Sequence, residues 1–148
     1  MMNLKLFTAK IIILCTLVLV VGCNKDDNPT APSQTGLVGT WQINKMTFTP
    51  KDTTIAPAVL TSDWLTRAGY FWTIKLKSDS TYECSLNLGD EPHTEQGTWS
   101  TSGNKLNASF GTEKSSFEYS LDNNTLILEA DSIEDGVAVR VTFEFKRQ

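Results

Sequence analysis

Hydrophobic and polar residues alternate with a period of two over much of the chain beyond residue 36. The alternation is uninterrupted over residues 137–146 and equally regular over 70–77 and 82–88. A period of two places every second side chain on one face of a β-strand, whereas a helix requires a period of 3.6. Each segment is therefore predicted to be a strand with one buried face. Five weaker segments follow the same rule and bring the expected number of strands to eight: 40–48, 96–101, 105–110, 116–121 and 125–130.

The connections between the predicted strands alternate between short and long. Three are tight and rich in Ser, Asp and Asn, which favour turns: 78–80, 102–104 and 122–124. The other four are longer: 49–69, 89–95, 111–115 and 131–136. Strict alternation predicts an all-β fold, an eight-stranded antiparallel up-and-down β-barrel with its long loops at one end. In the first long loop, Thr61-Ser62-Asp63 before Trp64 predicts one short helix that ends at Gly69 and lies across the mouth.

The first 22 residues have the parts of a processing signal. Lys5 and Lys10 precede an apolar run at 11–21, which is shorter than the roughly 20 residues that a membrane-spanning helix needs. The run ends in Val20-Val21-Gly22-Cys23, which resembles the lipobox of bacterial lipoproteins, in which the Cys is acylated and becomes the mature N-terminus. We therefore expect a signal peptide over 1–22 and lipid attachment at Cys23. A Cys that merely follows a secretory cleavage site is the alternative.

Composition and charge behind Cys23 indicate how the domain is held. Residues 24–36 contain two prolines and no large apolar side chain, so 23–36 are expected to form a lipidated Cys and flexible tether to a domain at 37–148. Without Lys5 and Lys10, 11 of the 13 basic residues remain against 17 acids, a net charge of −6. Anchoring therefore depends on lipid, and not on attraction to anionic headgroups.

The first residues of this tether also bear on location. Lys25-Asp26-Asp27 is similar to the export signal of Bacteroidota lipoproteins, with ordinary linker polarity as the alternative. The expected location is the outer membrane of a Gram-negative bacterium, on its periplasmic face or on the cell surface.

Short motifs near the strand starts resemble those of one family. Gly39-Thr40-Trp41 opens the first predicted strand, Gly97-Thr98-Trp99 repeats it, and TWSTSGNKLNASF, YSLDNNTLILE and a closing VTFEFKR follow. Together they resemble the lipocalin-like domains of bacterial lipoproteins over nearly all of 37–148. The resemblance implies that Trp41 closes one end of the barrel beneath a basic residue of the last strand. Parity along that strand turns Arg147 inward beside Trp41, so this barrel-closing pair is expected to form a cation–π contact.

The inward parity of the predicted strands bears on whether the barrel is filled or hollow. An eight-stranded barrel is either just filled by its side chains or holds one small ligand. Large aromatic side chains favour a filled interior, whereas the polar groups of Tyr and Trp are typical of a small-molecule pocket. Both interpretations stay open. The expected lumen set is Trp41, Ile43, Tyr70, Trp72, Ile74, Tyr82, Leu86, Trp99, Leu106, Phe110, Phe117, Tyr119, Leu126, Leu128, Val139, Val141 and Phe143. Its candidate ligand-lining members are Tyr70, Trp72, Tyr82, Trp99, Phe110, Phe117, Tyr119 and Phe143.

Charge in the long loops affects which ligands can reach the mouth. Three basic residues lie there, Lys51, Arg67 and Lys114, against nine acidic ones: Asp52, Asp63, Asp90, Glu91, Glu95, Glu113, Asp131, Glu134 and Asp135. An acidic mouth repels an anionic amphiphile and favours a neutral or cationic one, or a basic partner protein. The alternative is that these acids simply keep the protein soluble.

Residues suited to catalysis or metal binding are few. A Ser–His hydrolase or a zinc site would need more partners than His93, the only histidine. The acids around His93 are interpreted as a solvated loop, in preference to a weak divalent-cation site. Cys84 shares inward parity with Tyr82 and is expected to be a buried, small apolar residue that forms no disulfide. The sequence predicts no enzyme, no metal, no cofactor and no nucleic-acid partner.

Three hypotheses from different classes remain. The first is a membrane-anchored binder of a small hydrophobic or amphiphilic molecule at the cell envelope. The second is a filled barrel that engages an envelope protein or a protease, with no cavity and an exposed apolar patch near Trp64, Leu65 and Phe71. An enzyme ranks third, because the lumen set contains no titratable cluster. A two-sheet sandwich and an avidin-like barrel are the fold alternatives, and a ladder between the first and last strands would exclude the sandwich.

Overall fold

The computed structural model describes residues 34–89 and 91–148. The predicted signal peptide over 1–22, the lipid attachment at Cys23 and the tether up to residue 33 lie outside these residues. Within them, no helix has both the length and the apolar character needed to cross a membrane.

Antiparallel strands make up most of the described chain, with two short helices near its start. The helices are α2 (Gln34–Leu37) and α3 (Ser62–Arg67). The strands are β1 (Gly39–Pro50), β2 (Ala58–Thr61), β3 (Phe71–Leu76), β4 (Thr81–Asn87), β5 (His93–Ser102), β6 (Lys105–Phe110), β7 (Glu113–Asp122), β8 (Thr125–Glu134) and β9 (Val137–Arg147).

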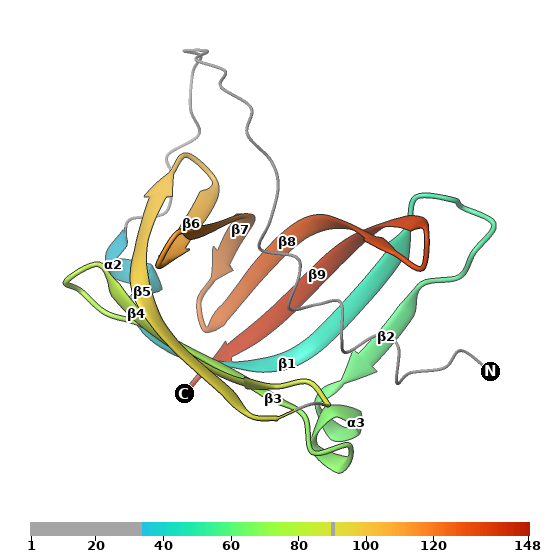
Figure 1. The fold of residues 1–148 in the computed structure, drawn as a ribbon, viewed down its shortest axis with the longest axis horizontal. Coiled ribbons are helices and arrows are strands. Elements are labelled where there is room, and N and C mark those ends of the chain that lie inside the picture. Colours follow the sequence, from blue (N-terminus) through green and yellow to red (C-terminus); the bar gives the residue numbers. More distant parts are fainter. Residues whose placement is uncertain (1–33, 90) are drawn as a thin grey trace.

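The sheet closes on itself into a barrel (Figure 1). Each strand from β3 to β8 pairs with the next along the chain, and β1 pairs with both β3 and β9. The closing ladder runs from Trp41 opposite Arg147 to Pro50 opposite Val139. This ladder confirms the eight-stranded antiparallel up-and-down barrel and excludes the two-sheet sandwich. The short strand β2 is an addition that pairs with the second half of β1.

Two of the four connections expected to be long are tight turns. Gly111 and Thr112 alone join β6 to β7, and Asp135 and Gly136 alone join β8 to β9. Gly111, Asp135 and Gly136 have positive φ angles of 58°, 50° and 82°, which suit two-residue hairpin turns. The sequence-based prediction was wrong here because polar inward residues in the extended strands resemble loop residues.

A bulge in β1 changes which of its side chains face the core. The register against β9 shifts between Ile43 and Lys45, so Asn44 is the additional residue. Beyond this point Met46 and Phe48 are buried, at 1% and 5% exposed. The expected lumen set omitted both, because strict alternation continued from Trp41 would place them outside.

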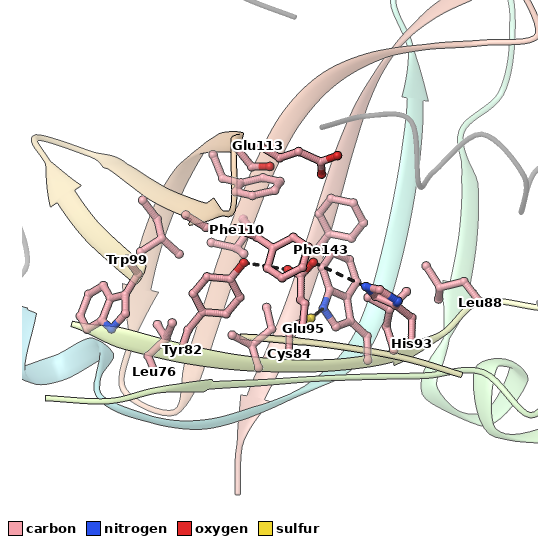
Figure 2. A pocket seen from close by; sticks show the side chains of 18 residues that line it. Leu76, Tyr82, Cys84, Leu88, His93, Glu95, Trp99, Phe110, Glu113 and Phe143 are labelled. Carbon is pink, nitrogen blue, oxygen red and sulfur yellow. Dashed lines mark hydrogen bonds and ion pairs between the residues drawn. The ribbon is translucent and has the colours of Figure 1, made fainter. Parts of the chain in front are cut away.

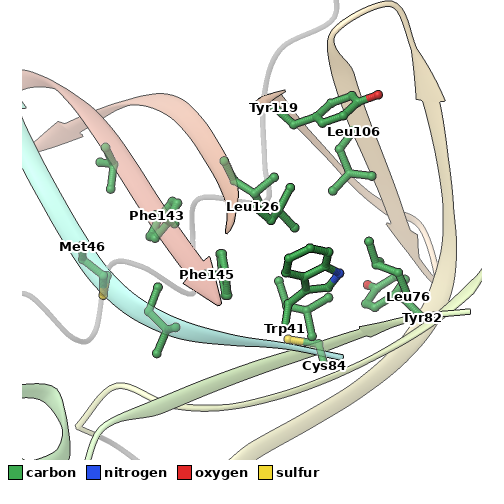
Figure 3. Packing of buried hydrophobic residues seen from close by; sticks show 14 of the residues in the cluster. Trp41, Met46, Leu76, Tyr82, Cys84, Leu106, Tyr119, Leu126, Phe143 and Phe145 are labelled. Carbon is green, nitrogen blue, oxygen red and sulfur yellow. The ribbon is translucent and has the colours of Figure 1, made fainter. Parts of the chain in front are cut away.

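The barrel end at Trp41 is closed by side chains (Figure 3). Trp41 is fully buried and its Nε1 donates to the Leu37 carbonyl oxygen at 2.8 Å. The Arg147 guanidinium lies 4.2 Å from the centre of the Trp41 ring and donates to the Val38 and Gly36 carbonyls. A Cβ on Gly39 would overlap with this guanidinium, so any side chain at that position would force Arg147 to shift. Arg147 thus ties α2 and the end of β9 to the same end of the barrel.

The predicted helix forms as α3, but it packs beside β1 and β2 and contributes no residue to the lining of the cavity described below. It starts after Thr61 and buries Leu65, which is 2% exposed, against the core cluster. Trp64 packs edge-on against Tyr70, with ring centroids 5.5 Å apart.

A charged cluster on the outer face of β1 and β9 predicts a defined acid sensitivity. Glu144 pairs with Lys45 at 2.7 Å and accepts a hydrogen bond from Asn44. Lys45 and then Asn44 hold the pKa of Glu144 below its ordinary 4.5, against the opposing effect of burial. A carboxyl whose pKa is lowered by folding stabilises the folded state above its unfolded pKa, and that stability is lost as the pH falls through the folded pKa.

We therefore expect Glu144→Gln to be less stable than the wild type at pH 7 and to lose less stability on acidification below about pH 4.5. Urea unfolding at a series of pH values measures both curves. They should converge in acid, and parallel curves would contradict the assignment.

Candidate functional site

An internal cavity of about 320 Å³ lies inside the barrel. Figure 2 shows the 18 side chains that line it. They come from β3 through β7, from the β4–β5 connection, and from one residue each of β8 and β9, Leu128 and Phe143. The volume is at the lower end of the range for small-molecule sites. The barrel is therefore hollow on the side of β3 to β7, which answers the question that the sequence left open.

Aromatic side chains make up a third of the lining. Six of the eight candidate residues line the cavity: Trp72, Tyr82, Trp99, Phe110, Phe117 and Phe143. Trp72 stands edge-on to Phe143, with centroids 4.9 Å apart, and donates its Nε1 hydrogen to the Cys84 sulfur at 3.1 Å. Phe110 is 41% exposed and the His93 side chain 53% exposed, so the cavity opens beside them.

The other two candidates, Tyr70 and Tyr119, do not line the cavity. Tyr70 precedes β3 and packs on Trp64 of α3. Tyr119 is buried beside Leu106 nearer the closed end (Figure 3), and this burial raises the pKa of its phenol. Parity correctly turned Tyr119 inward but carried no information on depth along the barrel.

A carboxylate with a defined position points into this apolar space. Glu95 lies on β5 and its Oε1 accepts a hydrogen bond of 2.8 Å from the Tyr82 hydroxyl (Figure 2). Its Oε2 lies 3.7 Å from His93 Nε2. Gly97 leaves room for the Tyr82 ring, because a Cβ at this position would overlap with the Ser109 carbonyl and with the ring itself. The glycine therefore allows Tyr82 to reach Glu95.

Sequence reasoning missed three titratable residues that line the cavity. His93, Glu95 and Glu113 were placed in solvated loops, and the lumen set contained no histidine and no acidic residue. The alternation did contain a signal for them. On β5, every second residue counted back from the inward-facing Trp99 faces the same way, and these residues include Glu95 and His93. The same step back from Phe117 along β7 reaches Glu113.

The predicted acidic mouth is only partly present. Asp131 pairs with Lys51 at 2.8 Å, and this contact is the main reason that its pKa is lowered. Glu134 is 7% exposed and accepts a hydrogen bond from Ser132. Asp90 lies outside the described residues. Negative charge therefore lies partly in the cavity lining, at the half-buried Glu95 and the exposed Glu113, and not only in the loops.

Among the described residues, no group of three or more His, Cys, Asp and Glu side chains could hold a metal ion. Cys84 is buried, as expected from its parity, and its sulfur accepts the hydrogen bond from Trp72. No Lys or Arg is found among the side chains that line the cavity. The arrangement is therefore suited to enclosing an apolar group beside a hydrogen-bond acceptor.

Comparisons with known proteins agree with this architecture. A family model for the lipocalin-like domain matches residues 37–128. No curated protein matches the chain.

Solved structures similar to this one include three lipocalin-type proteins. The bovine lipocalin allergen Bos d 2 is 14% identical with a TM-score of 0.47, and the match covers 79% of this chain and 76% of that one. Bovine odorant-binding protein in complex with a selenium-containing odorant is 12% identical with a TM-score of 0.45, covering 84% and 78%. The siderocalin Ex-FABP, described as having dual ligand specificities, is 14% identical with a TM-score of 0.43, covering 76% and 74%. By its family match over residues 37–128, the chain belongs to the family of lipocalin-like domains.

Proposed function

We propose that this protein is a lipid-anchored lipoprotein that binds a small hydrophobic or amphiphilic molecule, neutral or cationic, at the cell envelope. The observation that carries the proposal is the apolar cavity of about 320 Å³ inside a closed barrel. Proteins with the lipocalin fold bind small hydrophobic ligands and are typically carriers without enzymatic activity. The bovine odorant-binding protein with its bound odorant is one such case.

The size of the cavity limits the ligand. A volume of about 320 Å³ is at the lower end of the range for small-molecule sites, which favours a ligand of modest size. Each buried methylene contributes about 0.8 kcal/mol, so an eight-carbon chain supplies about 6 kcal/mol before the costs of association. A short single-chain amphiphile therefore fits better than a two-chain lipid.

The filled-barrel alternative loses its structural basis. It predicts no cavity and an exposed apolar patch at Trp64, Leu65 and Phe71. The cavity is present, Leu65 is 2% exposed, and Trp64 and Phe71 are half-buried. A protein partner at the envelope is accordingly not part of the proposal.

Titration with 1-octanol tests the binding function. Trp72 and Trp99 line the cavity and report on it through their fluorescence. The full chain in lipid nanodiscs should show a saturable change that empty nanodiscs do not show. A response that only rises linearly with octanol, as partition into lipid would produce, contradicts the function.

The proposed anchor rests on the apolar run at 11–21 and on Val20-Val21-Gly22-Cys23. The proposed location is the outer membrane of a Gram-negative bacterium, on the periplasmic face or the surface, and Lys25-Asp26-Asp27 supports it. Growth of the producing bacterium with an alkyne-tagged fatty acid tests the anchor. The wild type should take up the label and partition into detergent, and Cys23→Ala should do neither. Equal labelling of both proteins would overturn the anchor while leaving the binding function intact.

A further inference from the structure

The most informative group in the cavity is the one least expected in an apolar lining. The Glu95 side chain is 24% exposed and lines the same space as Trp72 and Phe143. A carboxylate removed from water is costly unless hydrogen bonds or opposite charge compensate it. What compensates Glu95 therefore indicates what the cavity accepts.

Glu95 has one hydrogen-bond donor within the described residues, and part of its side chain remains open to solvent. A carboxylate offers about four lone-pair sites, and Glu95 accepts one hydrogen bond, from Tyr82. His93 Nε2 lies 3.7 Å away, which is beyond hydrogen-bond length. Acceptor capacity thus remains on a carboxylate that Tyr82 holds in place inside the cavity.

The surrounding charges favour a cation over an anion. Glu113 also lines the cavity and forms no ion pair with another described residue, and no Lys or Arg lines it. The aromatic rings that line the same space, among them Tyr82 and Phe143, offer negative faces that attract organic cations. The carboxylates, the aromatic rings and the absence of Lys and Arg from the lining all favour a cationic ligand.

We infer that Glu95 is the binding site for the ammonium head of a single-chain amphiphilic amine, whose apolar tail occupies the rest of the cavity. The inference rests on the proposed function and makes it more specific. Selectivity then resides in one carboxylate inside the barrel, and not in the acids of the surrounding loops. Tyr82 is a positioning residue, because it acts through the orientation of Glu95.

Three ligands with the same eight-carbon chain test the inference: 1-octylamine, 1-octanol and octanoate. An alkylammonium remains protonated at pH 7, as the side chain of lysine does. Binding is measured on the full chain in lipid nanodiscs by tryptophan fluorescence, with empty nanodiscs as the blank. Because a hydrogen bond to a charged group is strong, octylamine should bind at least about tenfold more tightly than octanol. Octanoate should bind more weakly than octanol.

Variants separate the carboxylate from general acidity. Glu95→Gln should remove the amine preference and leave octanol affinity within about threefold, since its size is preserved. Glu91→Gln is the matched control, because Glu91 is exposed and does not line the cavity, and it should keep the preference. Glu95→Asp retains the charge but has a side chain shorter by one methylene, so it should keep part of the amine preference. It replaces the Gln variant as the test if that variant fails to fold.

The possible outcomes separate the inference about Glu95 from the proposed binding function on which it rests. Binding of octanol and octylamine with equal affinity overturns the inference alone. An amine preference that survives in Glu95→Gln does the same, because the selective charge then lies elsewhere. Failure of all three ligands to bind the wild type overturns the proposed function and the inference together.

Discussion

Truncation of Trp41 to alanine is expected to lower the free energy of unfolding by about 3–5 kcal/mol, as for other large aromatic residues in cores. Trp41 is fully buried at the closed end of the barrel, where it contacts α2 through the Leu37 carbonyl and β9 through Arg147. Its removal leaves a cavity under Arg147 and an unsatisfied carbonyl at Leu37. Urea denaturation monitored by circular dichroism measures the loss.

Two further variants show whether the closure acts as described. Trp41→Phe keeps an apolar ring but loses the indole donor, so its cost should be smaller than that of the alanine variant. Arg147→Met keeps much of the side-chain bulk and should still destabilise, because it leaves the carbonyls of Gly36 and Val38 without their donor. A cost below about 1 kcal/mol for Trp41→Ala would contradict the packing of this end.

The second large effect concerns the cavity itself. We expect Ala108→Phe to reduce octanol affinity at least about tenfold, a loss of about 1.4 kcal/mol or more. Ala108 lines the cavity on β6, and a volume of about 320 Å³ is already at the lower limit for a ligand site. The added ring occupies space that the ligand needs. The fluorescence titration used for the wild type measures the change.

Ser109→Phe is the matched control for this variant. Ser109 is the next residue on β6 and alternates to the outer face of the barrel, so the same ring is added outside the cavity. Octanol affinity should remain that of the wild type. Wild-type affinity in Ala108→Phe itself would show that the ligand binds somewhere else.

The architecture was predictable because the core follows the period of the strands. Trp72, Tyr82 and Phe143 lie on the buried parity of strongly alternating segments, and all three line the cavity. The contact between Trp41 and Arg147 could also be predicted, because antiparallel order brings the end of β9 beside the start of β1. One face of each strand must be buried, so register and topology follow largely from the hydrophobic pattern.

The polar content of the site was not predictable in the same way. Glu95 and Glu113 face inward, but a binary pattern interprets a polar residue at a strand end as part of a loop. The bulge at Asn44 does leave a marker, because the apolar positions change from odd at Trp41 and Ile43 to even at Met46 and Phe48, but strict alternation continued from Trp41 overlooked this change. The hydrogen bond between Tyr82 and Glu95 depends on the close approach at Gly97, which only the assembled barrel reveals.

A native mass spectrum of the full chain, purified gently from the cells that produce it and compared with a denatured sample, tests the central claim most directly. The account predicts an additional mass that is lost on unfolding and that corresponds to a small, single-chain amphiphilic amine. Recovery of an anionic ligand in the barrel would contradict the assignment of Glu95. A polypeptide that carries no additional mass, and that gains none when octanol or octylamine is supplied in excess, would contradict the binding function itself.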